Sequence, residues 1–175
     1  RIREVSDGRW MMDMHGMFFD FPSTFSAVNT AGLAPIGSHL RYVPDFADWN
    51  GRLVLATDET SIQGNPRAGQ PQSNLWFGTM DDLKHWGPGS GYGGPWVNES
   101  VAAHSPSLPF LVNGFTQRVL HLAVSDGQTV EITIEVDHNG TGNWHTHNTV
   151  EVTGYHPYIF PEQFDAQWIR LRSNR

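Results

Sequence analysis

The chain has 175 residues, of which 38% are hydrophobic, so it is long enough to bury the core of one domain. Its formal net charge of −7 argues against a nucleic-acid partner, which would favour a basic face. Cysteine is absent, which excludes a disulfide framework and a thiolate metal site. No apolar run reaches the roughly 18–20 residues of a membrane-spanning helix, so no membrane span is predicted.

The hydrophobic pattern of the chain is that of β-strands. Short apolar runs rich in β-branched and aromatic residues recur between clusters of Gly, Pro, Asn and Asp. The cleanest alternation places Val130 and Ile132 on one face and Glu131 and Thr133 on the other, as in a half-buried antiparallel strand. In chain order, strands are predicted at Arg9–Met14, Met17–Phe21, Ser38–Pro44, Arg52–Thr57, Ser73–Thr79, Val97–Ala102, Ser107–Val112, Arg118–Ser125, Val130–Asp137, Asn148–Val152, Tyr155–Phe160 and Gln167–Arg172.

The order of these strands indicates an internal repeat. The stretch 38–79 resembles the stretch 105–137, and His39 and His104 lie 65 positions apart. A period of this size suits a four-stranded propeller blade with long loops. The segment 75–86, a strand followed by a tight acidic turn and a Trp, supports the same interpretation. A β-sandwich with coincidental spacing is the alternative.

We therefore predict an all-β fold in which residues 1–175 form part of a single β-propeller domain. Residues 1–37 would end one blade, residues 38–103 would form the next, and residues 104–175 would form another blade and the start or closure of a further one. This amounts to about two and a half four-stranded blades, whereas propellers close with roughly 4–8 blades. An open piece leaves strand edges unpaired. The chain is therefore expected to be a fragment, with the remainder of the propeller as a partner.

Residues at the start of the innermost strands converge near the axis of a propeller, which makes His39, Arg41 and His104 the candidate catalytic residues. Histidine suits proton transfer because its unperturbed pKa lies at about 6.5. The arginine fork suits a carboxylate, because it can bind both oxygens. The alternatives are a structural hydrogen-bonding role for each histidine and an ordinary ion pair of Arg41 with Asp45 or Asp58.

Tyrosine and tryptophan rings suit sugars because they combine flat apolar faces with a polar edge. For four of the tryptophans, Trp86, Trp96, Trp144 and Trp168, packing is the favoured explanation. Substrate binding is predicted for His15, Gln70, Gln72, Asn74, Trp76, Tyr92 and Trp96.

His145 and His147 share one face of a predicted strand and follow His138 closely. That spacing is compatible with a metal, but a solvated surface is the favoured interpretation, so no metal ligand is predicted. A calcium ion is compatible with propeller folds, although the sequence shows no carboxylate cluster for one. No cofactor is therefore predicted, and calcium is left open.

Several segments of the chain resemble one group of enzymes, and they do so in the same order over nearly the whole length. The group comprises the seven-bladed propeller enzymes of glycoside hydrolase family 145 and polysaccharide lyase family 27. The block Gln70–Gly78 is the most specific part of the resemblance. The segments are His15–Pro22, Gly37–Arg41, Gln70–Gly78, Gly94–Trp96, Pro109–Leu111 and the closing run Ile134–Arg170.

The resemblance implies an extracellular or periplasmic carbohydrate-active enzyme that removes terminal L-rhamnose linked to glucuronic acid on arabinogalactan-type glycans. One family hydrolyses this bond, and the other cleaves it by β-elimination. Elimination needs a base for the uronate C5 proton and positive charge for the developing enolate, roles that His39 or His104 and Arg41 would supply. In the hydrolases the key histidine is expected in an early blade outside this chain. The alternatives are a non-catalytic glycan-binding propeller and a propeller that binds proteins.

Overall fold

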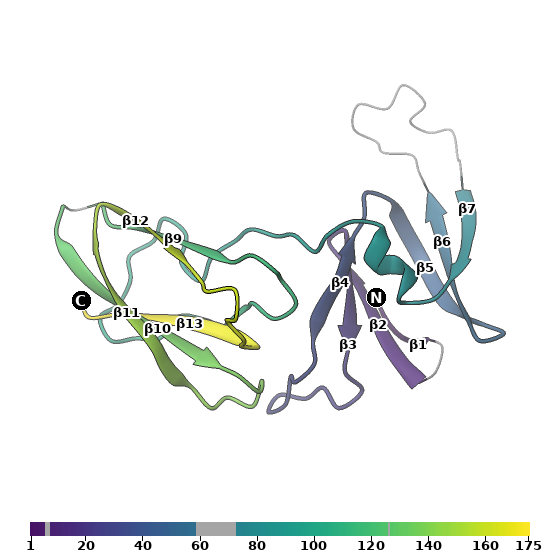
Figure 1. Ribbon diagram of the computed structural model, residues 1–175, viewed down its shortest axis with the longest axis horizontal. Coiled ribbons are helices and arrows are strands. Elements are labelled where there is room, and N and C mark those ends of the chain that lie inside the picture. The colour runs from purple at the N-terminus through teal and green to yellow at the C-terminus, as the bar shows by residue number, and fades with distance from the viewer. Residues whose placement is uncertain (6–7, 59–72, 126) are drawn as a thin grey trace, which may run out of the picture. The chain divides into compact units, whose positions relative to one another are not determined.

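The computed structural model describes residues 1–5, 8–58, 73–125 and 127–175, which form antiparallel β-strands and one short 3₁₀ helix (Figure 1). The predicted all-β fold is confirmed. Among the described residues, no helix is long and apolar enough to cross a membrane. The elements are β1 Ile2–Val5, β2 Arg9–Met14, β3 Met17–Phe21, β4 Ala34–Ser38, β5 Tyr42–Trp49, β6 Arg52–Asp58, β7 Ser73–Gly78, η2 Asp82–His85, β8 Phe110–Leu111, β9 Val119–Ala123, β10 Thr129–Asp137, β11 His145–Thr153, β12 Tyr155–Ile159 and β13 Trp168–Ser173.

Three predicted strands differ from the structure. The prediction Ser38–Pro44 is wrong, because β4 ends at Ser38 and β5 begins only at Tyr42. The prediction Val97–Ala102 is wrong because Asn98 takes a left-handed φ of 51°, which a strand does not allow. The predicted strand 107–112 is reduced to the two residues of β8.

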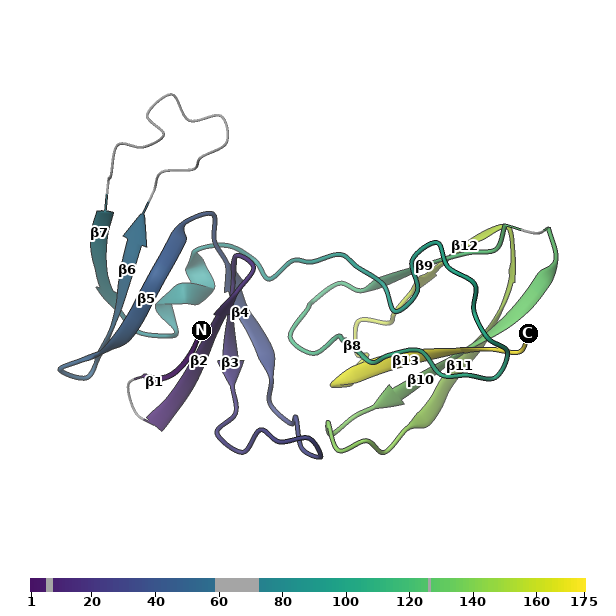
Figure 2. The same cartoon turned by 180° about the vertical axis from the view of Figure 1, so that it is seen from behind.

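The chain forms two compact units, which are described separately. The first unit comprises Arg1–Phe25 and Gly32–Ser90, and the second comprises Ser26–Ala31 and Gly91–Arg175. The first contains β1 to β7 and η2, and the second contains β8 to β13 (Figure 2). The blade boundaries at residues 37 and 103 stay a prediction.

The first unit consists of two antiparallel meanders, in which consecutive strands are hydrogen-bonded neighbours. One has the order β1-β2-β3-β4 and the other the order β5-β6-β7. A two-residue turn joins β2 to β3 at His15 and Gly16, whose φ angles of 52° and 77° are both left-handed. That pattern is typical of the type I′ turns that match the twist of a hairpin.

Apolar side chains from both meanders form the core of the first unit. Met11 and Phe18 from the β1–β4 sheet lie in one buried cluster with Leu53 and Leu55 of β6, and all four are inaccessible to solvent. Full burial of such side chains contributes about 1.5–3 kcal/mol each. The cluster therefore explains why the two meanders form one unit.

The 3₁₀ helix η2 closes this core and follows a turn in which Thr79 and Asp82 are joined by reciprocal hydrogen bonds. The backbone N–H and the hydroxyl of Thr79 both donate to Asp82 Oδ2 at 2.8 Å, and the Asp82 N–H donates to the Thr79 hydroxyl at 3.3 Å. Leu83 then inserts into the core, where it is fully buried. The acidic turn predicted after β7 is therefore this helix start.

The second unit consists of a four-stranded sheet and a separate two-stranded sheet. The larger sheet has the order β11-β10-β13-β8, and the smaller one pairs β9 with β12. Val136, Ile134 and Leu171 from the larger sheet lie in one buried cluster with Leu122 of the smaller one. Because the apolar faces of the two sheets share this core, the unit has two layers.

The strand pairing of the second unit does not repeat that of the first. Strands β5, β6 and β7 pair in sequence, whereas β8, β9 and β10 pair with β13, β12 and β11 respectively. The similarity of the two sequence stretches is therefore not accompanied by the same topology.

Candidate functional site in the first unit

The centre of the candidate site is a hydrogen-bonded pair formed by Asp13 of β2 and His39, the residue after β4. His39 Nε2 lies 3.0 Å from Asp13 Oδ1. The His39 side chain is 4% exposed and that of Asp13 is 12% exposed. The pair forms because the backbone N–H of His39 donates to the Gly16 carbonyl, which continues the β3–β4 pairing by one residue.

The second ring nitrogen of His39 is also occupied. Nδ1 lies 2.9 Å from the carbonyl oxygen of Arg41, which can only accept, so Nδ1 carries a hydrogen. The imidazole is therefore held between two oxygen atoms, the Arg41 carbonyl and the Asp13 carboxylate, in a setting where burial strengthens both contacts.

An aromatic array surrounds this pair. The His39 ring stacks on Phe18 with centroids 4.3 Å apart, and Phe18 meets Trp86 edge to face at 5.7 Å. Trp86 in turn meets Trp76 of β7 edge to face at 5.2 Å. The guanidinium of Arg41 lies over the Trp86 ring at 5.4 Å from its centroid.

This geometry links His39 to Arg41 in a defined way. The His39 imidazole binds the Arg41 backbone carbonyl, and Trp86 supports the Arg41 side chain, so both ends of that residue are positioned. Arg41 is exposed, and Asp45, one of its two predicted ion-pair partners, pairs instead with Arg1 and Arg3. The arrangement can present a guanidinium to an anionic group next to the buried Asp13–His39 pair.

The other predicted residues of the first unit have separate positions. His15 is exposed and occupies the first position of the β2–β3 turn, where its left-handed φ serves the turn geometry. Asn74 is exposed at the start of β7, and its carbonyl oxygen accepts a bond from the Thr57 hydroxyl. Trp76 is half-buried against the core. Gln70 and Gln72 lie outside the described residues.

The remaining predicted residues belong to the second unit. His104 is exposed with a φ of 59°, and its backbone N–H donates to the Ser173 carbonyl at 2.7 Å. Its own carbonyl oxygen accepts from the Arg172 guanidinium. Tyr92 is fully exposed, whereas Trp96 packs against the core of the second unit.

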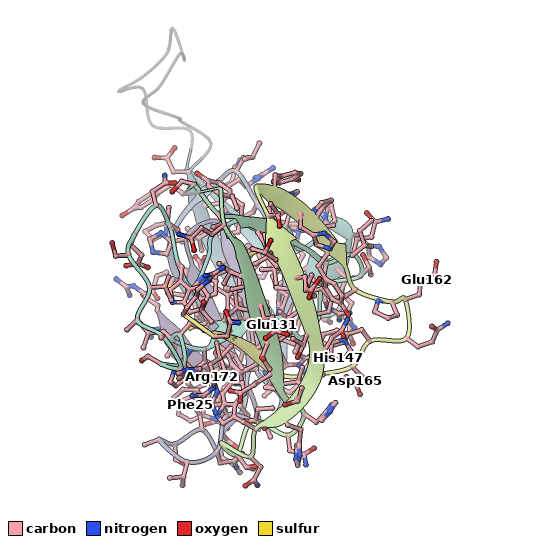
Figure 3. All side chains as sticks on the ribbon, turned by 90° about the vertical axis from the view of Figure 1, so that its left-hand side faces the viewer. Phe25, Glu131, His147, Glu162, Asp165 and Arg172 are labelled. Carbon is pink, nitrogen blue, oxygen red and sulfur yellow. The ribbon has the colours of Figure 1, made fainter. Side chains whose placement is uncertain are left out.

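The second unit also contains a shallow pocket of about 520 Å³. Arg118 lies in it, but its guanidinium donates to the carbonyl oxygens of Val112 at 2.8 Å and Phe164 at 2.9 Å. Glu162 also lines this pocket, and Figure 3 shows it on the outside of the loop between β12 and β13. Because the Arg118 guanidinium is bonded to backbone carbonyls, the pocket is a weaker candidate for a functional site than the region around His39.

No group of three or more His, Asp or Glu side chains suited to a metal occurs among the described residues. His145 and His147 do not present one common face to a ligand. A β-bulge places His147 between two paired positions of β11, and its ring packs on Phe160 and Phe164. The ring of His145 has His138 as its neighbour instead.

The acidic residue of the site, Asp13, was not among the predicted site residues. Its signal was a lone carboxylate in the apolar run Arg9–Met14, two residues before His15. An isolated charge in a half-buried strand calls for a partner. The sequence could not identify that partner, since His39 lies 26 positions further along the chain.

Comparisons of the chain with protein-family models, with curated proteins and with solved structures find no match.

Proposed function

We propose that the protein acts on glycans that carry terminal L-rhamnose linked to glucuronic acid, and that the site around His39 belongs to the acting centre. The observation that supports the proposal is the buried hydrogen-bonded pair of Asp13 and His39 beside the positioned Arg41. Arg41 would bind the uronate carboxylate, for which its fork is suited. Sugar rings would lie against the aromatic surface of the site.

Both ways of cleaving the bond need a proton transfer that this pair could assist. In β-elimination a base removes the C5 proton of the uronate, and the nearby positive charge of Arg41 stabilises the enolate. In hydrolysis an acid protonates the leaving oxygen. Asp13 is the more exposed member of the pair. Asp13 would therefore face the substrate, while His39 would position Asp13 and exchange a proton with it. His104 stays a predicted contributor.

A non-catalytic glycan-binding role is the second candidate, and one observation favours it. Both ring nitrogens of His39 have protein partners, and its side chain is almost completely buried. A histidine held in this way can fix Arg41 for binding without exchanging protons with a sugar. Both candidates act on glycans outside the cytoplasm, and so we place the protein in an extracellular or periplasmic setting.

We also propose that the first unit is part of a β-propeller. Two consecutive antiparallel meanders are the arrangement expected of neighbouring blades. One face of the β5–β6–β7 sheet carries apolar side chains that remain exposed: Trp49 is 67%, Leu75 is 64% and Phe77 is 43% exposed. A further blade packed on that face would bury them, in keeping with the remainder of a propeller as partner.

The test is incubation of the protein with gum arabic, following both free rhamnose and the absorbance of an unsaturated uronate. Rhamnose together with new absorbance would support elimination, and rhamnose alone would support hydrolysis. The variant R41A should abolish either signal, with R41K as the control that keeps the charge but loses the fork. Binding without release would support the second candidate, and the absence of both binding and release would refute the proposal.

A further inference from the structure

The outer face of the two-stranded β9–β12 sheet in the second unit differs from its inner face. Leu122 points to the core and is 7% exposed, whereas Val119 is 48%, Tyr155 is 60% and Ile159 is 72% exposed. Side chains of a strand alternate between its two faces, so the exposed residues lie together. We name this surface the hairpin platform; its six residues are Val119, His121, Ala123, Tyr155, Pro157 and Ile159.

Two rings of the hairpin platform are joined to each other. His121 Nδ1 lies 2.7 Å from the Tyr155 hydroxyl oxygen. Their centroids are 6.0 Å apart and their planes differ by 18°, so the rings lie nearly parallel with their edges connected by the hydrogen bond. They occupy diagonal positions of the ladder, since Tyr155 pairs with Ala123 and His121 with Pro157. The hydrogen bond thus holds both exposed rings in one orientation.

We propose that the hairpin platform binds the apolar face of a pyranose ring in a glycan chain. The rings of Tyr155 and His121 offer a flat apolar surface, and their polar atoms lie at its edge, which matches the C–H face and hydroxyl rim of a sugar. When the Tyr155 hydroxyl donates to Nδ1, Nε2 of His121 carries the hydrogen and can donate to a sugar hydroxyl. Fixing both rings in advance reduces the entropy lost on binding.

The size of the hairpin platform favours a sugar over a protein partner. It consists of six side chains on two short strands, whereas a stable protein interface uses about 20–30 residues on each side. A single sugar ring needs little more than the two joined rings. This binding surface goes beyond the proposed site around His39, because it belongs to the other unit and requires no cleavage of the glycan.

The experiment is affinity electrophoresis of the intact protein through gels that contain arabinogalactan, followed by calorimetric titration with galactan oligosaccharides. We expect the wild-type protein to be retarded and Y155A to lose about tenfold or more in affinity. Y155F keeps the ring but loses the hydrogen bond to His121, and should lose about threefold. L108A removes an exposed apolar side chain outside the hairpin platform and serves as the matched control.

Equal retardation of wild-type protein and Y155A would overturn the proposal, and so would the absence of retardation on any glycan gel. A concentration-dependent dimer that Y155A abolishes would also overturn it, since the surface would then bind a second copy. Tyr155 is exposed, so Y155A should keep the wild-type Tm, which excludes unfolding as the cause of lost binding. The variant R41A separates the two proposals, because it should lose rhamnose release and keep the part of the retardation that Y155A removes.

Discussion

Asp13 and His39 lie 26 positions apart in the chain and meet with 3.0 Å between Oδ1 and Nε2, while the opposite ring nitrogen is held by the Arg41 carbonyl. Both ring nitrogens of His39 are therefore bound to oxygen atoms of the protein. The pair is therefore both a structural link between β2 and the β4–β5 connection and the feature that supports the proposed chemistry.

Replacing Asp13 should destabilise the protein by different amounts in the two simplest variants. D13A leaves Nε2 buried without a partner and should lower the free energy of unfolding by about 3 kcal/mol. D13N should cost only about 1 kcal/mol, because its amide can donate to Nε2 of a neutral imidazole while Nδ1 still donates to Arg41. Urea denaturation measures both values. Equal losses for the two variants would contradict a hydrogen bond between residue 13 and His39.

His147 should make the stability of the second unit depend on pH. Burial lowers the pKa of His147, and the nearby His138 lowers it further. The unfolded chain then binds a proton at a higher pH than the folded chain does. The stability contributed by neutral His147 is therefore complete above the usual histidine pKa of about 6.5 and is lost as the pH falls below it.

The variant H147Q tests this dependence, since its amide can still bond to the Tyr158 hydroxyl that contacts His147 Nε2 at 3.1 Å. We expect Tm to fall less steeply between about pH 7.5 and 5.5 in H147Q than in the wild-type protein. The other histidines are unchanged and supply the background slope. Identical slopes would show that His147 does not contribute.

Gly140 should tolerate substitution much less well than its neighbour Gly142. Both have left-handed φ angles, 66° and 82°, but a Cβ on Gly140 would lie 2.6 Å from Thr30 Oγ1, whereas one on Gly142 would meet nothing within 4 Å. That threonine hydroxyl also accepts from the Trp168 indole at 2.7 Å. The space at Gly140 is therefore already occupied by a tertiary contact.

We expect G142A to lower the free energy of unfolding by about 1 kcal/mol, the cost of a left-handed alanine. G140A should lose about 2–4 kcal/mol, because overpacking adds to the same backbone cost. Chemical denaturation monitored by tryptophan fluorescence measures both. A loss in G140A no larger than in G142A would show that Thr30 can move aside.

The reciprocal hydrogen bonds between Thr79 and Asp82 should make Asp82 contribute more to the stability of the first unit than the adjacent Asp81 does. Hydrogen bonds from the Thr79 hydroxyl and backbone N–H lower the pKa of Asp82, so its contribution is present above the usual aspartate pKa of about 3.9 and is lost as the pH falls below it. Asp81 makes an exposed ion pair with Lys84 at 2.7 Å, a type of contact that adds little stability.

Calorimetry at neutral pH should therefore find a lower Tm for D82A than for D81A. At pH 3 the difference in Tm between the two variants should shrink, because the Asp82 carboxyl group is then protonated in a larger fraction of both folded and unfolded molecules. A Tm of D82A equal to that of the wild-type protein would exclude a role of the Thr79–Asp82 hydrogen bonds in stabilising the first unit.

Local patterns in the sequence determined much of the strand content. The hairpin β2–β3 follows from two apolar runs and a His15–Gly16 turn, all within a single short segment. Strand β10 follows from strict alternation of apolar and polar residues. These features depend on neighbouring residues alone, so they can be predicted without knowledge of the partners. The four-residue strand β1 was missed because three of its side chains are exposed and leave no pattern.

Only the tertiary structure decided which strands pair and which site residues meet. The strands of the two similar sequence stretches pair differently. In the first unit β5, β6 and β7 pair with one another, whereas in the second unit β8, β9 and β10 pair with β13, β12 and β11, because distant segments compete for each strand edge. His39 and Arg41 were predicted from local sequence, but the hydrogen-bonded pair also needs Asp13, which a different strand supplies. The physical reason is that hydrogen bonds and buried charges are satisfied in space, by residues whose separation along the chain leaves no local trace.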